Sequence, residues 1–244
     1  MARPGAAQDQ RLDFYPESDG KPMGESDAHV EELADWSLAV LKDHFEPRQD
    51  RVYVAGNNFL FYREGDRRAV VSPDVYVVKG VPQRLRRSFK VWEEGGARPE
   101  FVLEITSLST REEDLGEKMM RYRDDLEVLE YFLFDPREEW IGERLRGFRL
   151  VGGVYQPIQP DARGRLLSRA LGLELAAQDG HLRYFLPGAG TPLPTRRELA
   201  AEAEAGRLQA EAGRAQAEAE LARERARVAE LQAELERLRG GPPG

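Results

Sequence analysis

The sequence predicts a mixed α/β (α+β) body followed by a long helical tail. Residues 99–136 are arranged as strand, turn, helix and strand. After Pro136, short apolar runs alternate with turn residues, which is typical of β-hairpins. Residues 197–239 are almost entirely Ala, Glu, Arg and Leu, a composition that predicts one long helix. We therefore expect two domains, residues 1–195 and a tail over 196–240.

The N-terminal half of the body should contain one helix and several short strands. Residues 1–28 are rich in Gly, Pro, Asp and Ser and are expected on the surface. Apolar spacing predicts a helix from His29 to Phe45, which Pro47 ends. Strands are expected over Arg51–Tyr62 with a bend at Gly56-Asn57-Asn58, over Ala69–Val71, and after Pro73-Asp74.

The central stretch holds one charge in an apolar strand. Glu104 lies inside Phe101–Ile105, and a carboxylate in a buried strand is costly unless it is paired, hydrogen-bonded or bound to metal. Ser109 or Thr110 could cap the next helix, with Glu112 and Glu113 completing a capping box. One helix face would carry Leu115, Met119, Tyr122 and Leu126, and Tyr122 is interpreted as packing. A strand follows over Val128–Phe134.

The C-terminal part of the body should be an antiparallel extension of the central sheet. Pro187 to Pro194 then forms a linker. The expected strands are Trp140–Val151, Val154–Ile158, Leu166–Ser168, Leu171–Ala176 and Leu182–Leu186.

The tail is predicted to be a helix that can form a coiled coil near its end. Leu221, Val228 and Leu235 recur every seven residues, and Leu231 and Leu238 complete an a/d seam. Earlier, the seam is mostly alanine in a shifted register, and Gly206 and Gly213 each cost about 1 kcal/mol. A homodimer or another coiled-coil partner is therefore expected at the last heptads.

Composition excludes several classes of site. The chain has 244 residues and no cysteine, so disulfides and cysteine chemistry are absent. Its three histidines are scattered, which disfavours a histidine-rich zinc site. The sequence contains no apolar run long enough to cross a membrane and no signal peptide at its start, so we expect a soluble cytoplasmic protein. The net charge of −8 argues mildly against a nucleic-acid partner.

Two carboxylates and a lysine form the candidate catalytic site. Mg²⁺ prefers oxygen ligands and keeps several waters, so Asp74, Glu104 and the backbone carbonyl of Ile105 would suffice to hold it. Such a metal can activate water and polarise a phosphate. Lys118 could orient or deprotonate that water and stabilise developing charge. The plainer alternative for Lys118 is a solvated ion pair with Asp114, one helical turn earlier.

A basic run separates the two candidate carboxylates in the sequence. It has five cations and no acid, and it could contact nucleic-acid phosphates or simply be a solvated loop. The cations are Lys79, Arg84, Arg86, Arg87 and Lys90.

These motifs resemble those of a known family. Pro73-Asp74 with Glu104-Ile105-Thr106 resembles the PD-(D/E)XK nuclease signature, although the usual lysine position is Thr106. The longer pattern from Glu104 to Asp135-Pro136 looks like the Uma2 (DUF820) family of restriction-endonuclease-like proteins, in which the lysine lies on the following helix, as Lys118 does. The resemblance implies a central mixed sheet flanked by helices, Mg²⁺ (with Mn²⁺ as a substitute) and DNA as substrate. It also suggests Glu25 as a supporting acid.

The leading hypothesis is thus a Mg²⁺-dependent DNA endonuclease that acts as a dimer. One alternative is a catalytically inactive nuclease fold that binds nucleic acid or recruits protein partners through its coiled tail. Another is a nuclease for RNA or branched DNA.

Overall fold

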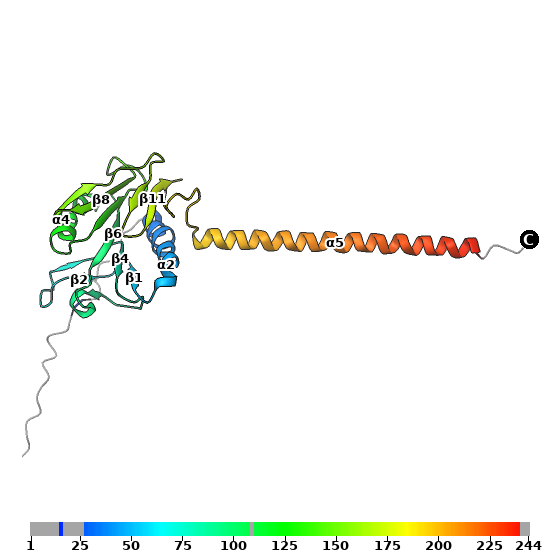
Figure 1. Ribbon diagram of the computed structural model, residues 1–244, viewed down its shortest axis with the longest axis horizontal. Helices are drawn as coiled ribbons and strands as arrows, with labels where there is room; N and C mark the ends of the chain where they lie inside the picture. The colour runs from blue at the N-terminus through cyan, green and yellow to red at the C-terminus, as the bar shows by residue number, and fades with distance from the viewer. Residues whose placement is uncertain (1–14, 17–26, 108–109, 240–244) are drawn as a thin grey trace, which may run out of the picture. The chain divides into compact units, whose positions relative to one another are not determined.

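The computed structural model describes residues 15–16, 27–107 and 110–239. The chain divides into two compact units, Met1–Thr195 and Arg196–Gly244. The first is a mixed α+β unit built around a central sheet, and the second is a long helix (Figure 1).

The central sheet has six strands in the order β1-β4-β6-β7-β8-β9. Strands β6 and β7 run parallel, and every other neighbouring pair is antiparallel, so the sheet is mixed as expected. The strands are β1 (Val52–Ala55), β4 (Val75–Lys79), β6 (Pro99–Ile105), β7 (Glu130–Phe134), β8 (Leu145–Val151) and β9 (Val154–Pro157).

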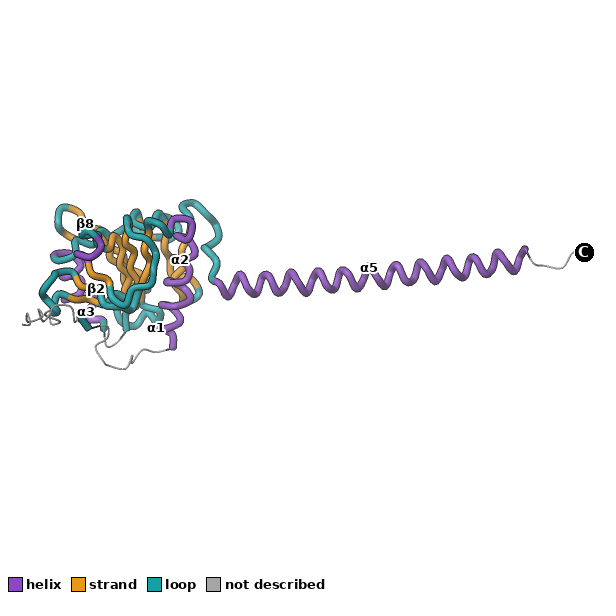
Figure 2. The backbone as a smooth tube through the Cα atoms, turned by 90° about the horizontal axis from the view of Figure 1, so that it is seen from below, coloured by secondary structure: helices purple, strands orange, loops and turns teal. Residues whose placement is uncertain are grey.

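One face of this sheet packs on the N-terminal helix and on a second sheet. Alternate residues of β6, including Phe101 and Leu103, point into this core together with Leu41. Figure 2 shows helix α2 alongside the strands. The second sheet contributes Leu173 and Leu182 and consists of β10 (Leu166–Ser168), β11 (Leu173–Gln178) and β12 (His181–Phe185).

The opposite face holds the second core and is the face toward which Glu104 points. Val102 lies in this core with Tyr122 and Leu133, and strand alternation places Glu104 on the same side as Val102. A third sheet, with strand order β3-β2-β5, adds Leu60 and Phe89 to this core. Its strands are β2 (Leu60–Phe61), β3 (Val70–Val71) and β5 (Phe89–Lys90), followed by the 3₁₀ helix η3 (Val91–Glu94).

The predicted N-terminal helix is confirmed, with an irregular middle. It comprises α1 (Asp27–Glu31), a π-helical segment η1 (Glu32–Leu38) and α2 (Ala39–Phe45), and the 3₁₀ turn η2 (Glu46–Arg48) follows. Buried Glu32 pairs with His181 and accepts a hydrogen bond from the Leu182 backbone, which ties the widened segment to β12. π-Segments inside helices often coincide with such side-chain demands.

The prediction of one continuous antiparallel extension is wrong. Only β8 and β9 extend the central sheet, whereas β10, β11 and β12 pair among themselves. The separation has a physical reason, since these strands use their apolar residues to cover the first core. Buried Glu130 joins the two sheets by accepting bonds from Arg149 and Ser168.

The predicted helix after Glu104 is broken in two. Helix α3 (Arg111–Leu115) and helix α4 (Glu117–Asp124) meet at Gly116, whose φ of −116° and ψ of −98° are not helical. Thr110 makes no side-chain capping bond to α3, so the expected capping box is absent there, and Ser109 lies outside the described residues. Because of this break, α4 begins at Glu117, one residue before Lys118.

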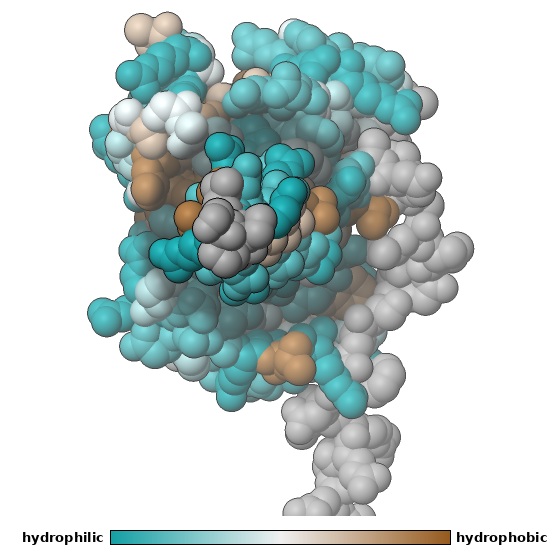
Figure 3. Space-filling model, turned by 90° about the vertical axis from the view of Figure 1, so that its right-hand side faces the viewer, coloured by the Kyte–Doolittle hydropathy of each residue, from teal (hydrophilic) through white to brown (hydrophobic). Residues whose placement is uncertain are grey.

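The predicted tail helix is confirmed as α5 (Arg196–Arg239). Its side chains are exposed along its described length. In the space-filling view of Figure 3, hydrophilic residues predominate on the visible side of the protein, and hydrophobic residues form separate patches. Within the residues that the structure describes, no helix combines the length and apolar character needed to cross a bilayer.

Candidate active site

Asp74 is held at the start of β4 by backbone contacts. Its Oδ2 accepts a hydrogen bond of 2.7 Å from the Ile105 backbone N–H, at the end of β6. Because Val75 pairs with Leu103, extending the antiparallel register by one residue places Asp74 opposite Glu104. Gly56 makes this possible, since a Cβ there would lie 1.9 Å from the Asp74 carbonyl oxygen.

Glu104 is fully buried, and both of its carboxylate oxygens have partners. Oε1 accepts a 2.5 Å hydrogen bond from the Tyr122 hydroxyl, and Oε2 lies 3.1 Å from the Lys118 Nζ. Both partners come from α4, which packs on this face of the sheet. The hydrogen bonds from Tyr122 and Lys118 therefore compensate for burying the Glu104 carboxylate in an apolar strand.

Lys118 joins two carboxylates from different elements. Its Nζ lies 2.9 Å from Asp114 Oδ1 as well as 3.1 Å from Glu104 Oε2. Thus the i,i+4 pair with Asp114 and the contact with Glu104 exist together. Neither pair is solvated, because Asp114 and Glu104 have side-chain exposures of 1% and 0%.

The electrostatics of the site favour a charged lysine. Burial raises the pKa of Glu104 well above its ordinary value, although Lys118 opposes this shift. Burial also raises the pKa of Asp114. Burial alone would lower the pKa of Lys118, but Glu104 and Asp114 outweigh it and raise the pKa. Lys118 is therefore an ammonium at neutral pH, suited to donating hydrogen bonds rather than to removing a proton from water.

Two further residues complete the surroundings. His29 Nε2, from α1, lies 3.5 Å from Asp74 Oδ1, and both side chains are largely buried. Thr106 occupies the position where the usual nuclease pattern has lysine. It is buried, and its Oγ1 has no hydrogen-bond partner among the described residues.

The donor set fits a hard divalent cation. Asp74, Glu104 and Asp114 are three carboxylates, and each is within electrostatic range of the single ammonium of Lys118, which leaves a net charge of −2 when all four are ionised. No three Asp, Glu or His side chains gather as a ready metal cage in the part of the chain that the structure describes. A metal would thus be held by two carboxylates with backbone or water oxygens, as Mg²⁺ tolerates.

Comparison with known proteins identifies the family. A family model described as "Uma2: Putative restriction endonuclease" matches residues 6–179, more than half of the chain. The chain belongs to the Uma2 family. No curated protein matches it.

Among solved structures, the chain is similar to the crystal structure of a "putative nuclease belonging to DUF820" from Anabaena variabilis. The two share 14% sequence identity with a TM-score of 0.43, and the match covers 62% of this chain and 76% of that one.

The five cations of the basic run of this Uma2 chain do not all lie beside Asp74 and Glu104. Lys79 ends β4, five residues after Asp74, and so lies at the other end of the strand, about 16 Å away at 3.3 Å per residue. It pairs with Glu100 at 2.9 Å. The sequence order suggested proximity, but the strand between them carries Lys79 away.

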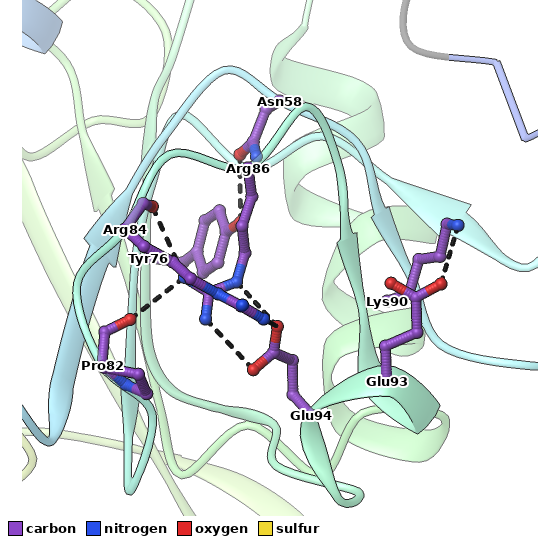
Figure 4. Close-up of polar contacts among 8 residues, drawn as sticks. All are labelled: Asn58, Tyr76, Pro82, Arg84, Arg86, Lys90, Glu93 and Glu94. Atoms are coloured by element: carbon purple, nitrogen blue, oxygen red, sulfur yellow. Dashed lines mark hydrogen bonds and ion pairs between the residues drawn. The ribbon is translucent and has the colours of Figure 1, made fainter.

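Three of the other cations, Arg84, Arg86 and Lys90, pair with acids that come just after the run. Figure 4 shows Glu94 of η3 contacting Arg86, and Glu93 contacting Lys90. Arg86 binds both oxygens of Glu94 at 2.7 and 3.1 Å, stacks over Tyr53, and is only 6% exposed. Arg84 also reaches Glu94, at 2.9 Å. A cleft of about 330 Å³ lies here, lined by Tyr15, Arg84, Leu85, Arg86, Arg87, Ser88, Lys90, Glu93 and Glu94.

Sequence reasoning missed three residues of the site. Tyr122 was interpreted as packing, Asp114 entered only as a solvated alternative partner, and His29 was expected only as a capping or core-satisfying group at the start of the first helix. The spacing of Asp114 and Tyr122 at i−4 and i+4 from Lys118 was the available signal, because such residues share one helix face. Glu25, the suggested supporting acid, lies outside the described residues.

Proposed function

We propose that this Uma2 protein is a Mg²⁺-dependent endonuclease that hydrolyses DNA phosphodiester bonds. The observation that carries the proposal is the meeting of Glu104 and Lys118, 14 residues apart, at a buried site next to Asp74. Membership of a family described as restriction endonucleases supports the same reaction class.

Each residue of the site has a proposed role. Asp74, Glu104 and the Ile105 carbonyl would hold the metal, with Mn²⁺ as a substitute for Mg²⁺. When bound, such a metal activates water and neutralises charge on the phosphate. Lys118 donates hydrogen bonds from its ammonium to the oxygens on which charge develops. Tyr122 orients Glu104, and His29 lies against Asp74.

The cleft beside η3 is the proposed contact for DNA phosphates. Arg84, Arg86, Arg87 and Lys90 line it, whereas Lys79 lies at the end of β4. Lys79 pairs with Glu100, Arg84 and Arg86 pair with Glu94, and Lys90 pairs with Glu93, so a phosphate would have to compete with those carboxylates. Binding through this cleft should therefore weaken steeply as salt rises.

A plasmid-nicking assay tests the enzyme proposal. Alanine at Asp74, Glu104 or Lys118 should reduce Mg²⁺-stimulated nicking at least 100-fold, and Asp74→Asn and Glu104→Gln should do the same with less structural change. Glu64→Gln, at an exposed turn, is the matched control and should cleave normally. Undiminished cleavage by all three alanine variants would reject the assignment. Parallel assays on RNA and branched DNA define the substrate.

The rival function is a nuclease fold without activity that works through its partners. The observation favouring it is that Lys118 already neutralises part of the charge that a metal would neutralise. Calorimetry distinguishes the two. The enzyme should bind Mg²⁺ or Mn²⁺ in a way that Glu104→Gln abolishes, whereas absence of binding at millimolar metal supports the rival.

A further inference from the structure

The first helix buries its residues in a register that its apolar spacing does not predict. An unbroken α-helix turns by about 100° per residue, so Val30 would share a face with core residue Leu41. In the structure Val30 is instead 43% exposed, whereas its neighbour His29 is only 7% exposed. The helix therefore exposes an apolar side chain and buries a polar one, which is unfavourable unless the buried side chain has a partner.

The π-helical segment η1 causes this change of register. Its backbone hydrogen bonds reach back five residues, as in the bond from the Ala39 N–H to the Ala34 carbonyl oxygen. The wider turn takes up one extra residue, which rotates α1 by about 100° relative to α2. This rotation removes Val30 from the core face and brings His29 and Glu32 into it.

Two polar contacts hold α1 in the shifted register. Toward β12, buried Glu32 pairs with His181 and accepts a hydrogen bond of 3.1 Å from the Leu182 backbone N–H. Toward β4, His29 Nε2 lies 3.5 Å from Asp74 Oδ1. The first contact joins the helix to residues outside the candidate active site and so anchors η1. The second reaches the active site itself.

The contact with His29 completes the placement of Asp74. Oδ2 of this carboxylate accepts the Ile105 backbone N–H at 2.7 Å, and Oδ1 faces His29. One oxygen is therefore held from β6 and the other from the helix. A carboxylate held at both oxygens has a fixed orientation toward a cation, and removing such a supporting contact typically weakens metal binding about 10- to 100-fold.

We propose that η1 is a register shift that turns His29 onto Asp74, where His29 positions the carboxylate for a divalent cation. The positioning role rests on the proposed function of this site. His29 is a positioning residue because it acts through Asp74. The pair of Glu32 with His181 keeps the shifted helix in place.

Thiol labelling tests the register shift, since the chain contains no native cysteine. Val30→Cys should react with iodoacetamide at least tenfold faster than His29→Cys, each made singly in the full chain, because only the first position is exposed. Deleting Ala34, an exposed residue of η1, should restore a regular helix and reverse this order. A faster reaction at His29→Cys in the undeleted chain overturns the shift, and so does an unchanged order in a deletion chain that circular dichroism shows to be folded.

Calorimetry with Mn²⁺ tests the positioning role without measuring cleavage. His29→Leu should weaken Mn²⁺ binding about 10- to 100-fold without lowering the thermal midpoint, since leucine fills the buried position with no polar atom. His29→Gln keeps a side-chain N–H donor and should bind Mn²⁺ within about threefold of the wild-type chain. His44→Leu, on α2, is the matched control and should leave Mn²⁺ binding unchanged.

The results separate this role from the proposed function. Mn²⁺ binding that His29→Leu leaves unchanged overturns the positioning role and leaves the proposed function standing. Equal losses in His29→Leu and His29→Gln overturn it as well, because the N–H donor would then make no difference. A wild-type chain that does not bind Mn²⁺ overturns the positioning role and the proposed function together, and the register shift is still decided by the labelling order.

Discussion

At the scale of single residues, the bond from Tyr122 to Glu104 joins stability to the site. Tyr122→Phe would leave Oε1 of a fully buried carboxylate without its donor, and we expect a loss of about 1–3 kcal/mol in urea unfolding. In a Glu104→Gln background the same change should cost less, because a neutral amide oxygen accepts the hydroxyl more weakly. Equal costs in the two backgrounds would contradict the role given to Tyr122.

Glu94 provides a prediction about pH. The hydrogen bond from Arg86 lowers the pKa of Glu94 below its ordinary value of 4.5, with Arg84 contributing. A carboxylate with a lowered folded-state pKa adds stability above its unfolded pKa and loses it as the pH falls through the folded value. Glu94→Gln should therefore cost about 1–2 kcal/mol at pH 7, and this difference should shrink as the pH falls below 4.5 and through the lower folded-state pKa.

The neighbouring acid is the control for that measurement. Glu93 pairs with Lys90, but its side chain is 55% exposed, so Glu93→Gln should change the unfolding free energy by less than about 0.5 kcal/mol. A pH-independent effect of Glu94→Gln would show that its contribution is packing rather than charge.

The site residues differed in how far sequence could predict them. Glu104 was predicted because it is a charge inside an apolar strand. Asp74 and Lys118 were predicted because they occupy the positions of the acid and the lysine in the family pattern. Tyr122 did not, since an aromatic at helical spacing is most often core, and its ring is indeed in the core while its hydroxyl serves Glu104. The pairing of the basic run with Glu93, Glu94 and Glu100 depends on how the chain folds back, which composition does not encode.

At the scale of elements, Gly56 sets how closely the bend after β1 approaches Asp74. An alanine Cβ would lie 1.9 Å from the Asp74 carbonyl oxygen, so the backbone must move. We expect Gly56→Ala to destabilise the body by about 2–4 kcal/mol and to reduce nicking, because Asp74 would be displaced. Gly190→Ala is the matched control, since its Cβ would meet nothing within 4 Å. Normal nicking by a folded Gly56→Ala variant would contradict this placement.

The elements themselves were predicted more accurately than their pairing. Apolar spacing located the N-terminal helix, apolar runs between turn residues located β10, and composition located the tail helix, because each of these signals is local in the sequence. The separation of β10–β12 from the central sheet was not predicted, because turn residues indicate hairpins without indicating which sheet they join. The break at Gly116 was missed for a similar reason, since one glycine in a helical pattern does not specify its backbone angles.

At the scale of the whole molecule, the two units should be separable. Residues 1–195 contain both hydrophobic cores and every proposed catalytic residue. We expect the 1–195 chain to fold with a thermal midpoint close to that of the full chain and to be monomeric. Circular dichroism and sedimentation check this. A 1–195 chain that fails to fold would contradict the division into domains.

Lys118 connects α4 to β6 through the same atoms that would serve the reaction. Removing its ammonium would leave the buried carboxylates of Glu104 and Asp114 facing each other without a cation. This would destabilise the fold whether or not the site is catalytic. A descendant that no longer cut anything would still be under selection to keep this lysine and both acids. The trio in a relative's sequence is then evidence of a shared scaffold first, and of a working enzyme only after cleavage has been measured.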